Sequence, residues 1–324
     1  MYSLKNKYKR AIVTGGAGFV GSHLVESLLD DGLEVVSVDD YSAGKKSNVQ
    51  QFLSNPKFRE FDCDITDADK LAGAFDGVDI VFHEAVSKMT VCLKDPRRDL
   101  EINAQGTFNI LELCRTFGVK KLVHASTGSV YGEAQYYPTN EKHPVNPTSY
   151  YGVSKLAGEK YVRLFSEMHG LDATILRYYH VYGPRQENSE VGGVVSIFAR
   201  RAMEGLPITI FGDGTQLRSF TYVGDVVNIN KFVASTGGTQ GEAYNCASGI
   251  RVTIQELAEQ IIDALGAKDI PIEYKDWKPG DIRIFDVDNS KLRNLGFNFE
   301  TEFEAGLRHT LKWTTEFLKA KKNV

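Results

Sequence analysis

Two short motifs combine hydroxyl, phenol and amine side chains at spacings that suit proton transfer. In ASTGSVYG, Thr127 and Ser129 flank a glycine directly after an apolar run. In SYYGVSK, Tyr151 and Lys155 are four residues apart, so both lie on one face if the segment is a helix. An ammonium close to a phenol favours the phenolate. Tyr151 could therefore remove a proton from a substrate hydroxyl near neutral pH.

Position supports this assignment more strongly than spacing does, because the same spacing recurs in YSAGK and YKDWK. Only Tyr151 is expected to start a helix downstream of a strand that ends in hydroxyl residues. Ligands of an open α/β sheet gather at the carboxyl ends of its strands, where ASTGSVYG would lie. Thr127 could then hydrogen-bond the hydroxyl that Tyr151 deprotonates. The structural alternative is that Thr127 and Ser129 only cap loops.

A glycine motif, VTGGAGFVG, lies between an expected strand and an expected helix. Its glycines at Gly15, Gly18 and Gly21 would let backbone amides approach a pyrophosphate, with Phe19 and Val20 at the start of the helix. The positive end of the helix dipole would favour the negative charge of such a group. The motif therefore predicts a dinucleotide site.

An acidic residue extends this prediction to the choice of cofactor. Asp39 ends the second expected strand, 18 residues after Gly21, where a carboxylate can accept hydrogen bonds from the adenosine ribose. It would repel a 2'-phosphate, so NAD is favoured over NADP, although Lys45 and Lys46 nearby would tolerate a phosphate. The positive ring of oxidised NAD would also favour the phenolate of Tyr151.

The elements that must position these motifs follow an alternating pattern. Each of five short β-branched runs precedes a turn and then a longer stretch with helical spacing: RAIVTG, EVVSVDD, VDIVFHEA, KLVHAST and ATILRYY. This alternation predicts an α/β fold with a doubly wound parallel Rossmann sheet. The rhythm breaks after about Tyr182. We therefore predict an NAD-binding Rossmann domain at 1–182 and a smaller C-terminal α/β lobe at 183–324, mainly for substrate and interleaved with the first.

The composition of the chain limits the classes of molecule that it could bind. The 324 residues are 42% apolar and 25% charged, which is typical of a globular protein. The net charge of -4 provides no basic surface for nucleic acid or anionic lipid, so we expect a small-molecule substrate. No signal peptide or membrane span is recognisable, and four scattered cysteines indicate reduced thiols. We expect a cytoplasmic protein without a metal site.

Together with RYYHVYGPRQ and RSFTYVGDVV, these motifs resemble those of the extended short-chain dehydrogenase/reductases of nucleotide-sugar metabolism. Within the NAD-dependent epimerase/dehydratase family, they are most similar to the UDP-glucose 4-epimerase-like branch. The resemblance implies a catalytic set of Thr127, Tyr151 and Lys155, with Lys155 also binding the nicotinamide ribose. Tyr151 would take the proton of the sugar 4-hydroxyl while the C4 hydride passes to a tightly bound NAD. The 4-keto sugar would then turn and be reduced on its other face.

The resemblance also implies residues for the nucleotide sugar. Arg218 matches a family arginine that holds the pyrophosphate, a role that suits its paired donors. The segment from Lys278 to Asp281 matches one that usually begins with arginine, so a second pyrophosphate contact there departs from the family pattern. Phe285 aligns with a position where a bulky aromatic is associated with excluding 2-acetamido sugars, which favours a 2-hydroxy hexose. Ser129 would contact the same substrate.

Other matched positions leave alternatives open. Asp64 and Ile65 could flank the adenine, or belong to a solvated acidic loop. His180 replaces a common family asparagine, and is either a nucleotide contact or a buried ring. In HEAVSKMTV, which departs from the family pattern H-x-A-A, Glu84 and Lys88 fall in a stretch that lines the sugar or nicotinamide. We expect Lys88 to contact cofactor and substrate, and an altered sugar is consistent with this departure.

Two further matches have structural readings beside functional ones. Asn103 resembles a family asparagine near the active-site helices, or is a helix-packing amide. Asp225 is either structural or functional.

The two positions after Thr127 carry no carboxylate, and this limits the reactions that the site could catalyse. Related 4,6-dehydratases usually have Asp and Glu after the hydroxyl residue, and related decarboxylases keep the Glu; here those positions hold Gly128 and Ser129. We therefore predict a nucleotide-sugar 4-epimerase acting on a UDP-hexose. The alternatives are a 4-dehydrogenase or 4-ketoreductase using the same site, a 4,6-dehydratase, or a non-catalytic NAD-sensing protein, which would commonly lack the tyrosine and lysine.

A homodimer is expected by analogy. The expected helices at 95–118 and 149–170 resemble a pair that forms a four-helix dimer interface in this family. Six apolar positions could serve that interface or equally form internal core: Ile102, Phe108, Ile110, Leu113, Val162 and Phe165. Tyr150 is expected to be a packing residue.

Overall fold

Two compact units make up the chain in the computed structural model, which describes residues 2–87, 89–190, 192–277 and 282–322. Each unit is assembled from three segments. Unit 1 comprises Met1–Glu133, Glu141–Tyr178 and Val226–Asn245, and unit 2 comprises Ala134–Asn140, Tyr179–Asp225 and Cys246–Val324. Each has its own buried apolar core.

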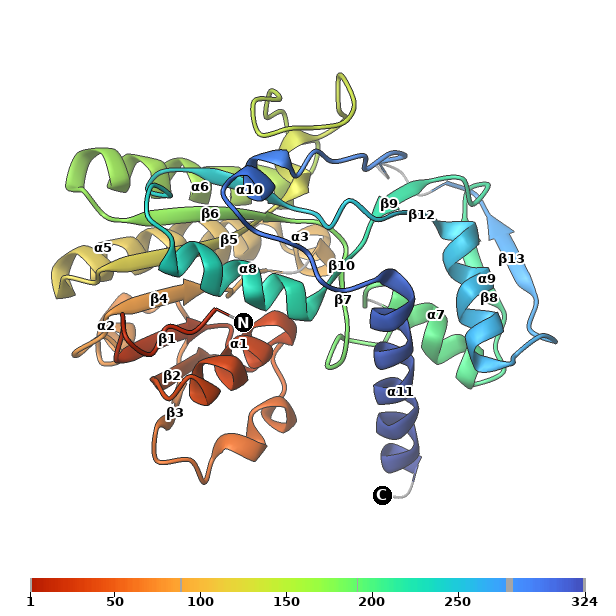
Figure 1. Ribbon diagram of the computed structural model, residues 1–324, viewed down its shortest axis with the longest axis horizontal. Coiled ribbons are helices and arrows are strands. Elements are labelled where there is room, and N and C mark those ends of the chain that lie inside the picture. Colours follow the sequence, from red (N-terminus) through yellow and green to blue (C-terminus); the bar gives the residue numbers. More distant parts are fainter. Residues whose placement is uncertain (1, 88, 191, 278–281, 323–324) are drawn as a thin grey trace. The chain divides into compact units, whose positions relative to one another are not determined.

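A seven-stranded sheet in the order β11-β6-β5-β4-β1-β2-β3 forms the centre of unit 1, and strands β1 to β4 lie side by side in Figure 1. The pairs β1–β2, β2–β3, β1–β4, β4–β5 and β5–β6 are parallel. The order reverses between β1 and β4, where such folds bind ligands at the carboxyl ends of the strands. The predicted doubly wound Rossmann sheet is confirmed. Its strands are β1 (Arg10–Thr14), β2 (Glu34–Asp39), β3 (Phe58–Asp62), β4 (Ile80–His83), β5 (Lys121–Thr127), β6 (Ala173–Tyr178) and β11 (Ala243–Cys246).

Helices flank this sheet and bury an apolar face against it. Ile12, Val81 and Leu122 of the strands share one core cluster with Ile110 and Val162 of the helices. The α-helices are α1 (Phe19–Asp30), α2 (Ala68–Ala72), α3 (Met89–Lys94), α4 (Pro96–Leu100), α5 (Thr107–Phe117), α6 (Tyr150–His169) and α8 (Val223–Ser235), which begins in unit 2. A π-helical segment at Glu101–Gly106 joins α4 to α5, and short 3₁₀ turns occur at Lys46–Asn48, Gln50–Phe52 and Gly128–Tyr131.

Unit 2 combines short paired strands with helices, as predicted for a smaller C-terminal α/β lobe. Helices α7, α9 and α11 bury Phe198, Leu257 and Leu307 in one core. A capping box between Thr253 and Glu256 starts α9. The strand pairs are β7 (Val181–Tyr182) with β10 (Thr221–Tyr222), β9 (Leu217–Ser219) with β12 (Arg251–Thr253), and β8 (Ile208–Phe211) with β13 (Ile272–Lys275); the helices are α7 (Val194–Met203), α9 (Ile254–Leu265), α10 (Ser290–Asn294) and α11 (Phe303–Lys322). Within the described ranges, no helix has the length and apolarity needed to cross a bilayer.

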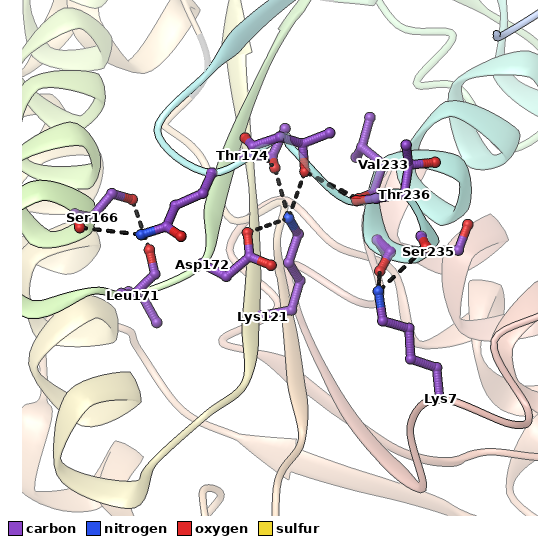
Figure 2. A network of polar contacts seen from close by, with 12 residues as sticks. Lys7, Lys121, Ser166, Leu171, Asp172, Thr174, Val233, Ser235 and Thr236 are labelled. Atoms are coloured by element: carbon purple, nitrogen blue, oxygen red, sulfur yellow. Dashed lines mark hydrogen bonds and ion pairs between the residues drawn. The ribbon is translucent and has the colours of Figure 1, made fainter. Parts of the chain in front are cut away.

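A buried ammonium ties the strands together at their amino ends, opposite the ligand edge. Lys121, at the start of β5, is 1% exposed. Its Nζ donates to Asp172 Oδ1 at 2.6 Å, Thr174 Oγ1 at 2.9 Å and Thr239 Oγ1 at 2.8 Å, and Figure 2 shows the side chains of Lys121, Asp172 and Thr174 converging. Lys7 donates nearby to two carbonyls at the end of α8. These contacts link β5, β6 and the segment before β11, so we assign this network a structural role.

Replacing the carboxylate of this network should destabilise the protein without affecting the ligand edge. In Asp172→Asn the buried Lys121 ammonium keeps only neutral acceptors and loses its counter-charge, so the free energy of unfolding should fall by about 2 kcal/mol, less than for a fully buried pair because Asp172 is partly exposed. Urea denaturation measures this. The double variant Lys121→Met/Asp172→Asn should recover at least half of the loss. An unchanged urea midpoint in Asp172→Asn would contradict the assignment.

Candidate active site

The glycine turn between β1 and α1 has the geometry that a dinucleotide requires. Gly15 has a φ of +66°, and a Cβ added to it would lie 2.8 Å from the backbone nitrogen of Ala85, so glycine is needed there. Residues 2–87 are described without a gap, and no side chain among them caps the amino end of α1 at Gly18. The amides of the first turn, including Phe19 and Val20, are therefore available to an anionic ligand.

Asp39 lies at the carboxyl end of β2, beside this turn, and its carboxylate is held in a fixed orientation. Its Oδ2 accepts the Ala17 N–H and its Oδ1 accepts the Tyr41 N–H, both at 2.9 Å. Burial raises the pKa of Asp39, and the two amide bonds oppose that change. Each carboxylate oxygen retains a second lone pair that a ribose hydroxyl could use. The glycine turn and this acceptor fit the adenosine diphosphate half of NAD.

The predicted adenine contacts lie in different environments. The Asp64 carboxylate accepts a hydrogen bond from the Arg98 guanidinium; burial opposes ionisation, yet bonds from Thr66 and Arg98 hold the pKa of Asp64 below its usual value. Asp64 is therefore not part of a freely solvated loop. Ile65 is buried in the core cluster of unit 1. Contact of either residue with adenine stays a prediction, and Lys88 lies outside the described residues.

The three residues expected to do the chemistry lie at the ends of two neighbouring elements. Thr127 is the last residue of β5, and Tyr151 and Lys155 lie one turn apart in α6. The Thr127 side chain lies close enough to the Tyr151 phenol to lower its pKa. Ser149 starts α6 by accepting the Gly152 N–H, which places Tyr151 in the first turn.

Ser129 also contacts Thr127, so the capping interpretation holds as well. Thr127 Oγ1 accepts the Ser129 N–H at 3.1 Å and donates to Ser129 Oγ at 3.2 Å. These bonds orient the threonine hydroxyl at the start of the 3₁₀ turn. The two interpretations of Thr127 are therefore compatible.

The electrostatics of this group explain why a bound cofactor matters. Burial and the Asp99 carboxylate raise the pKa of Tyr151, whereas the nearby Thr127 side chain lowers it. Burial lowers the pKa of Lys155 to about 8, against the effect of nearby carboxylates. Without a ligand, the phenolate is therefore unfavourable at neutral pH. A positive nicotinamide beside Tyr151 would lower the phenol's pKa, as the sequence analysis anticipated.

Asn103 belongs to a buried polar network beneath Tyr151, which bears on whether it is only a helix-packing amide. The Asn103 Nδ2 donates to Asp99 Oδ1 and to Ser154 Oγ, each at 3.0 Å, and Ser154 Oγ donates to Asp99 Oδ2 at 2.6 Å. Asn103 is more than a packing amide, since it joins the π-helical segment to α4 and α6. Asp99 and Ser154 are not among the residues predicted from the sequence. The signals were an acid four residues before Asn103 and a serine inside the SYYGVSK motif.

Unit 2 brings together three of the residues expected to contact the nucleotide. The rings of His180 and Phe285 have centroids 4.8 Å apart, and the Arg218 guanidinium lies 5.4 Å over the Phe285 ring. Burial, followed by the charge of Arg218, lowers the pKa of His180 to about 3, so its ring is neutral. The cluster therefore presents a fixed cation and an uncharged imidazole beside an aromatic ring.

The remaining predicted substrate residues are accounted for as follows. Asp225 is buried and its Oδ1 accepts the Glu300 N–H at 3.4 Å, which supports its structural reading. Lys278 and Asp281 lie outside the described residues. The four cysteines are buried, and none of them is in a disulfide. Among the residues with described positions, no group of three His, Cys, Asp or Glu could hold a metal ion.

Comparison with known proteins identifies the family. A family model described as the NAD dependent epimerase/dehydratase family matches residues 11–247. The chain belongs to this family. It is therefore an NAD-dependent enzyme of nucleotide-sugar chemistry, and the glycine turn and Asp39 described above fit its cofactor.

Members of the epimerase/dehydratase family resemble this chain over almost its whole length. A UDP-glucose 4-epimerase of Mycolicibacterium smegmatis is 38% identical over 310 residues, covering 94% of this chain and 98% of that protein. The structure of a UDP-glucose 4-epimerase of Thermotoga maritima with UDP-glucose has a TM-score of 0.90 at 35% identity, covering 95% and 99% of the two chains. A UDP-N-acetylglucosamine 4-epimerase of Methanobrevibacter ruminantium, with UDP-N-acetylmuramic acid, has a TM-score of 0.89 at 35% identity, covering 96% and 99%.

The glycine turn can be tested by a matched pair of substitutions. Gly15→Ala should remove most of the bound NAD and destabilise the protein by roughly 1–3 kcal/mol, because alanine is strained at this φ and its Cβ meets the Ala85 backbone. Gly237→Ala should change neither property, since an added Cβ there has no heavy atom within 4 Å. NAD released on denaturation and the melting temperature are the measurements. Full NAD content in Gly15→Ala would rule out the proposed contact.

Proposed function

We propose that this family member is a nucleotide-sugar 4-epimerase that converts a UDP-hexose through a transient 4-keto sugar. The observation that carries the proposal is the meeting of Thr127 and Tyr151 at the carboxyl end of β5, with no carboxylate at the next two positions, Gly128 and Ser129. Elimination or decarboxylation in related enzymes uses acids there. A hydroxyl and a phenol can orient the alcohol and take its proton, and NAD would be the hydride acceptor that the reversible oxidation also needs.

Each of the three proposed catalytic residues has a separate role in the reaction. The Thr127 hydroxyl orients the sugar 4-hydroxyl, and Tyr151 takes its proton. The Lys155 ammonium stabilises the phenolate and binds the nicotinamide ribose. When bound, NAD would supply an acceptor for the hydride on C4 of the sugar, and it could later return that hydride. When the other face of the keto sugar is reduced, Tyr151 returns the proton to the new hydroxyl, so the cycle consumes no net oxidant.

The nucleotide sugar is assigned to the second unit. We propose that residues 183–324 form mainly the substrate lobe, in which Arg218 binds the pyrophosphate through its paired donors. His180, a neutral ring, contacts the same nucleotide. Phe285, in contact with both, restricts the sugar and favours a 2-hydroxy hexose over a 2-acetamido sugar. Ser129 in unit 1 would contact the sugar beside Thr127.

Purified protein, with no added NAD, should interconvert the C4 epimers of a UDP-hexose, followed by NMR across a panel of UDP-, GDP-, CDP- and dTDP-sugars. Tyr151→Phe should reduce turnover by about 10²–10⁴-fold, because the proton acceptor is lost. The matched control is Tyr150→Phe, which should leave turnover unchanged. Tyr150 is 62% exposed.

Other outcomes of this experiment point elsewhere. Release of a keto sugar with a stoichiometric demand for NAD would indicate a dehydrogenase or ketoreductase. Retention of most activity in Tyr151→Phe would remove the assigned base. Efficient turnover of UDP-N-acetylglucosamine would contradict the role given to Phe285.

A row of exposed apolar side chains on α6 supports a homodimer. Val153, Tyr161, Leu164 and Met168 are exposed at helical spacing, and Phe108 of α5 is exposed and packs its ring edge-on against Tyr161. Tyr150 begins the row and is 62% exposed, so its expected packing role would be in the interface. Of the six positions considered, Ile110, Val162 and Phe165 are core, and Ile102 and Leu113 pack partly buried against it. Contiguous exposed apolar surface of this kind marks an interaction site.

We propose that two copies of the chain pair through this face, as a bundle of α5 and α6 helices. Four cysteines that form no disulfide also support the proposed cytoplasmic location.

Leu164→Glu should convert the dimer to a monomer, because it buries a charge in the proposed interface. Leu164 is 46% exposed. Sedimentation velocity at micromolar concentration measures the mass, and Leu206→Glu in unit 2, where Leu206 is 40% exposed, provides the control. A monomeric wild-type protein, or an intact Leu164→Glu dimer, would refute this interface.

A further inference from the structure

Glu84 carries a buried carboxyl group that the proposed mechanism does not use. It follows the last residue of β4 and is only 9% exposed. Its N–H donates to the Thr14 carbonyl, and its own carbonyl carbon would lie 3.0 Å from a Cβ added to Gly15. Glu84 is therefore next to the dinucleotide turn, in the HEAVSK segment that departs from the family pattern.

A directed chain of hydrogen bonds ends on this carboxyl group. The Asn230 Nδ2 donates to the Val226 carbonyl at 2.9 Å and to the Tyr178 Oη at 2.7 Å, which fixes the orientation of the amide. Because Tyr178 accepts from Asn230, its hydroxyl proton is free to be donated, and Glu84 Oε1 accepts it at 2.8 Å. A carboxylate accepts such a bond better than a neutral acid does. The chain therefore favours ionised Glu84.

The Lys155 ammonium lies among carboxylates without being paired to one. Three carboxylates favour its charged form from different elements: Glu84 after β4, Asp99 of α4 and Glu159 of α6. Within the described part of the chain, no carboxylate lies at ion-pair distance from Lys155. The nearby imidazoles of His83 and His124 have pKa values far below normal because of burial, so both are uncharged.

Two of these three carboxylates are already committed to other groups. Arg177 donates to both oxygens of Glu159, at 3.0 and 2.7 Å. Asp99 is bound by the Asn103 and Ser154 side chains of the network described above. Among the described residues, Glu84 accepts only from a neutral phenol. Asp99 likewise accepts only from neutral donors, but of the three carboxylates Glu84 has the largest effect on the pKa of Lys155.

We propose that ionised Glu84 is a positioning residue that keeps the buried Lys155 side chain in its ammonium form, and thereby holds in place the charge on which Tyr151 depends. The importance of this role for catalysis rests on the proposed function. The charge interaction itself belongs to the folded protein and does not require the reaction.

The direction of the pH effect follows from the two groups. Burial raises the pKa of Glu84 to about 7, and Lys155 loses its proton above about 8. Around pH 7–8 the pair is therefore ionised, and the negative charge of Glu84 raises the pKa of Lys155. Removing that charge lowers the pKa of Lys155, so the ammonium is lost at a lower pH.

Glu84→Gln tests this, because glutamine keeps the size and the acceptor for Tyr178 but not the charge. In NAD-loaded protein labelled with ¹⁵N-lysine, the Lys155 Nζ resonance, assigned by its absence in Lys155→Met, should titrate about one pH unit lower than in the wild type. The alkaline limb of the kcat profile should move in the same direction. Glu84→Asp, which keeps the charge, should restore most of both shifts.

Glu112→Gln is the matched control, since Glu112 is a partly exposed carboxylate of α5 paired with Arg115. It should leave the Lys155 titration unchanged. An unchanged Nζ titration in folded Glu84→Gln overturns the proposal, as does an equal shift in Glu112→Gln. Because the NMR readout needs no substrate, it decides the proposal even if the protein proves not to be an epimerase.

Discussion

Removing the Tyr151 phenol and the Lys155 ammonium from water is the constraint on which the proposed active site depends. Burial makes the charged form of each group costly, and it moves the two pKa values in opposite directions. Charge must then come from groups that the fold places nearby. Carboxylates on several elements favour the ammonium, and a positively charged cofactor would favour the phenolate. In the proposed mechanism, Tyr151 would act as a base only when the dinucleotide is bound, which suits an enzyme that retains its NAD through each turnover.

The parallel sheet separates this chemistry from stabilisation. At the carboxyl edge, the glycine turn, Asp39 and the end of β5 leave amides, a carboxylate and a hydroxyl able to meet ligands. At the amino edge, the Lys121 ammonium is bound by a carboxylate and two hydroxyls, which ties three segments of unit 1 together. Parallel strands put all their like ends on one side, so the two tasks fall on opposite edges of one sheet.

Local patterns explain what could be predicted without coordinates. The glycine motif, the strand ending in Thr127 and the spacing of Tyr151 and Lys155 each depend on residues within a few positions of one another. Turn geometry, helical periodicity and the position of strand ends are governed by such short-range rules. They were enough to predict the Rossmann sheet and the use of NAD.

By itself, then, the sequence determined the fold class, the family and the residue types at the catalytic edge. Only the tertiary structure decided which buried charges surround them. The bonds of Asp99 with Ser154 and of Glu84 with Tyr178 join residues 55 and 94 positions apart. It also decided that Tyr150 is exposed while Val162 on the same helix is core. The physical reason is that burial and charge coupling depend on distances between elements, and strand order and helix packing set those distances.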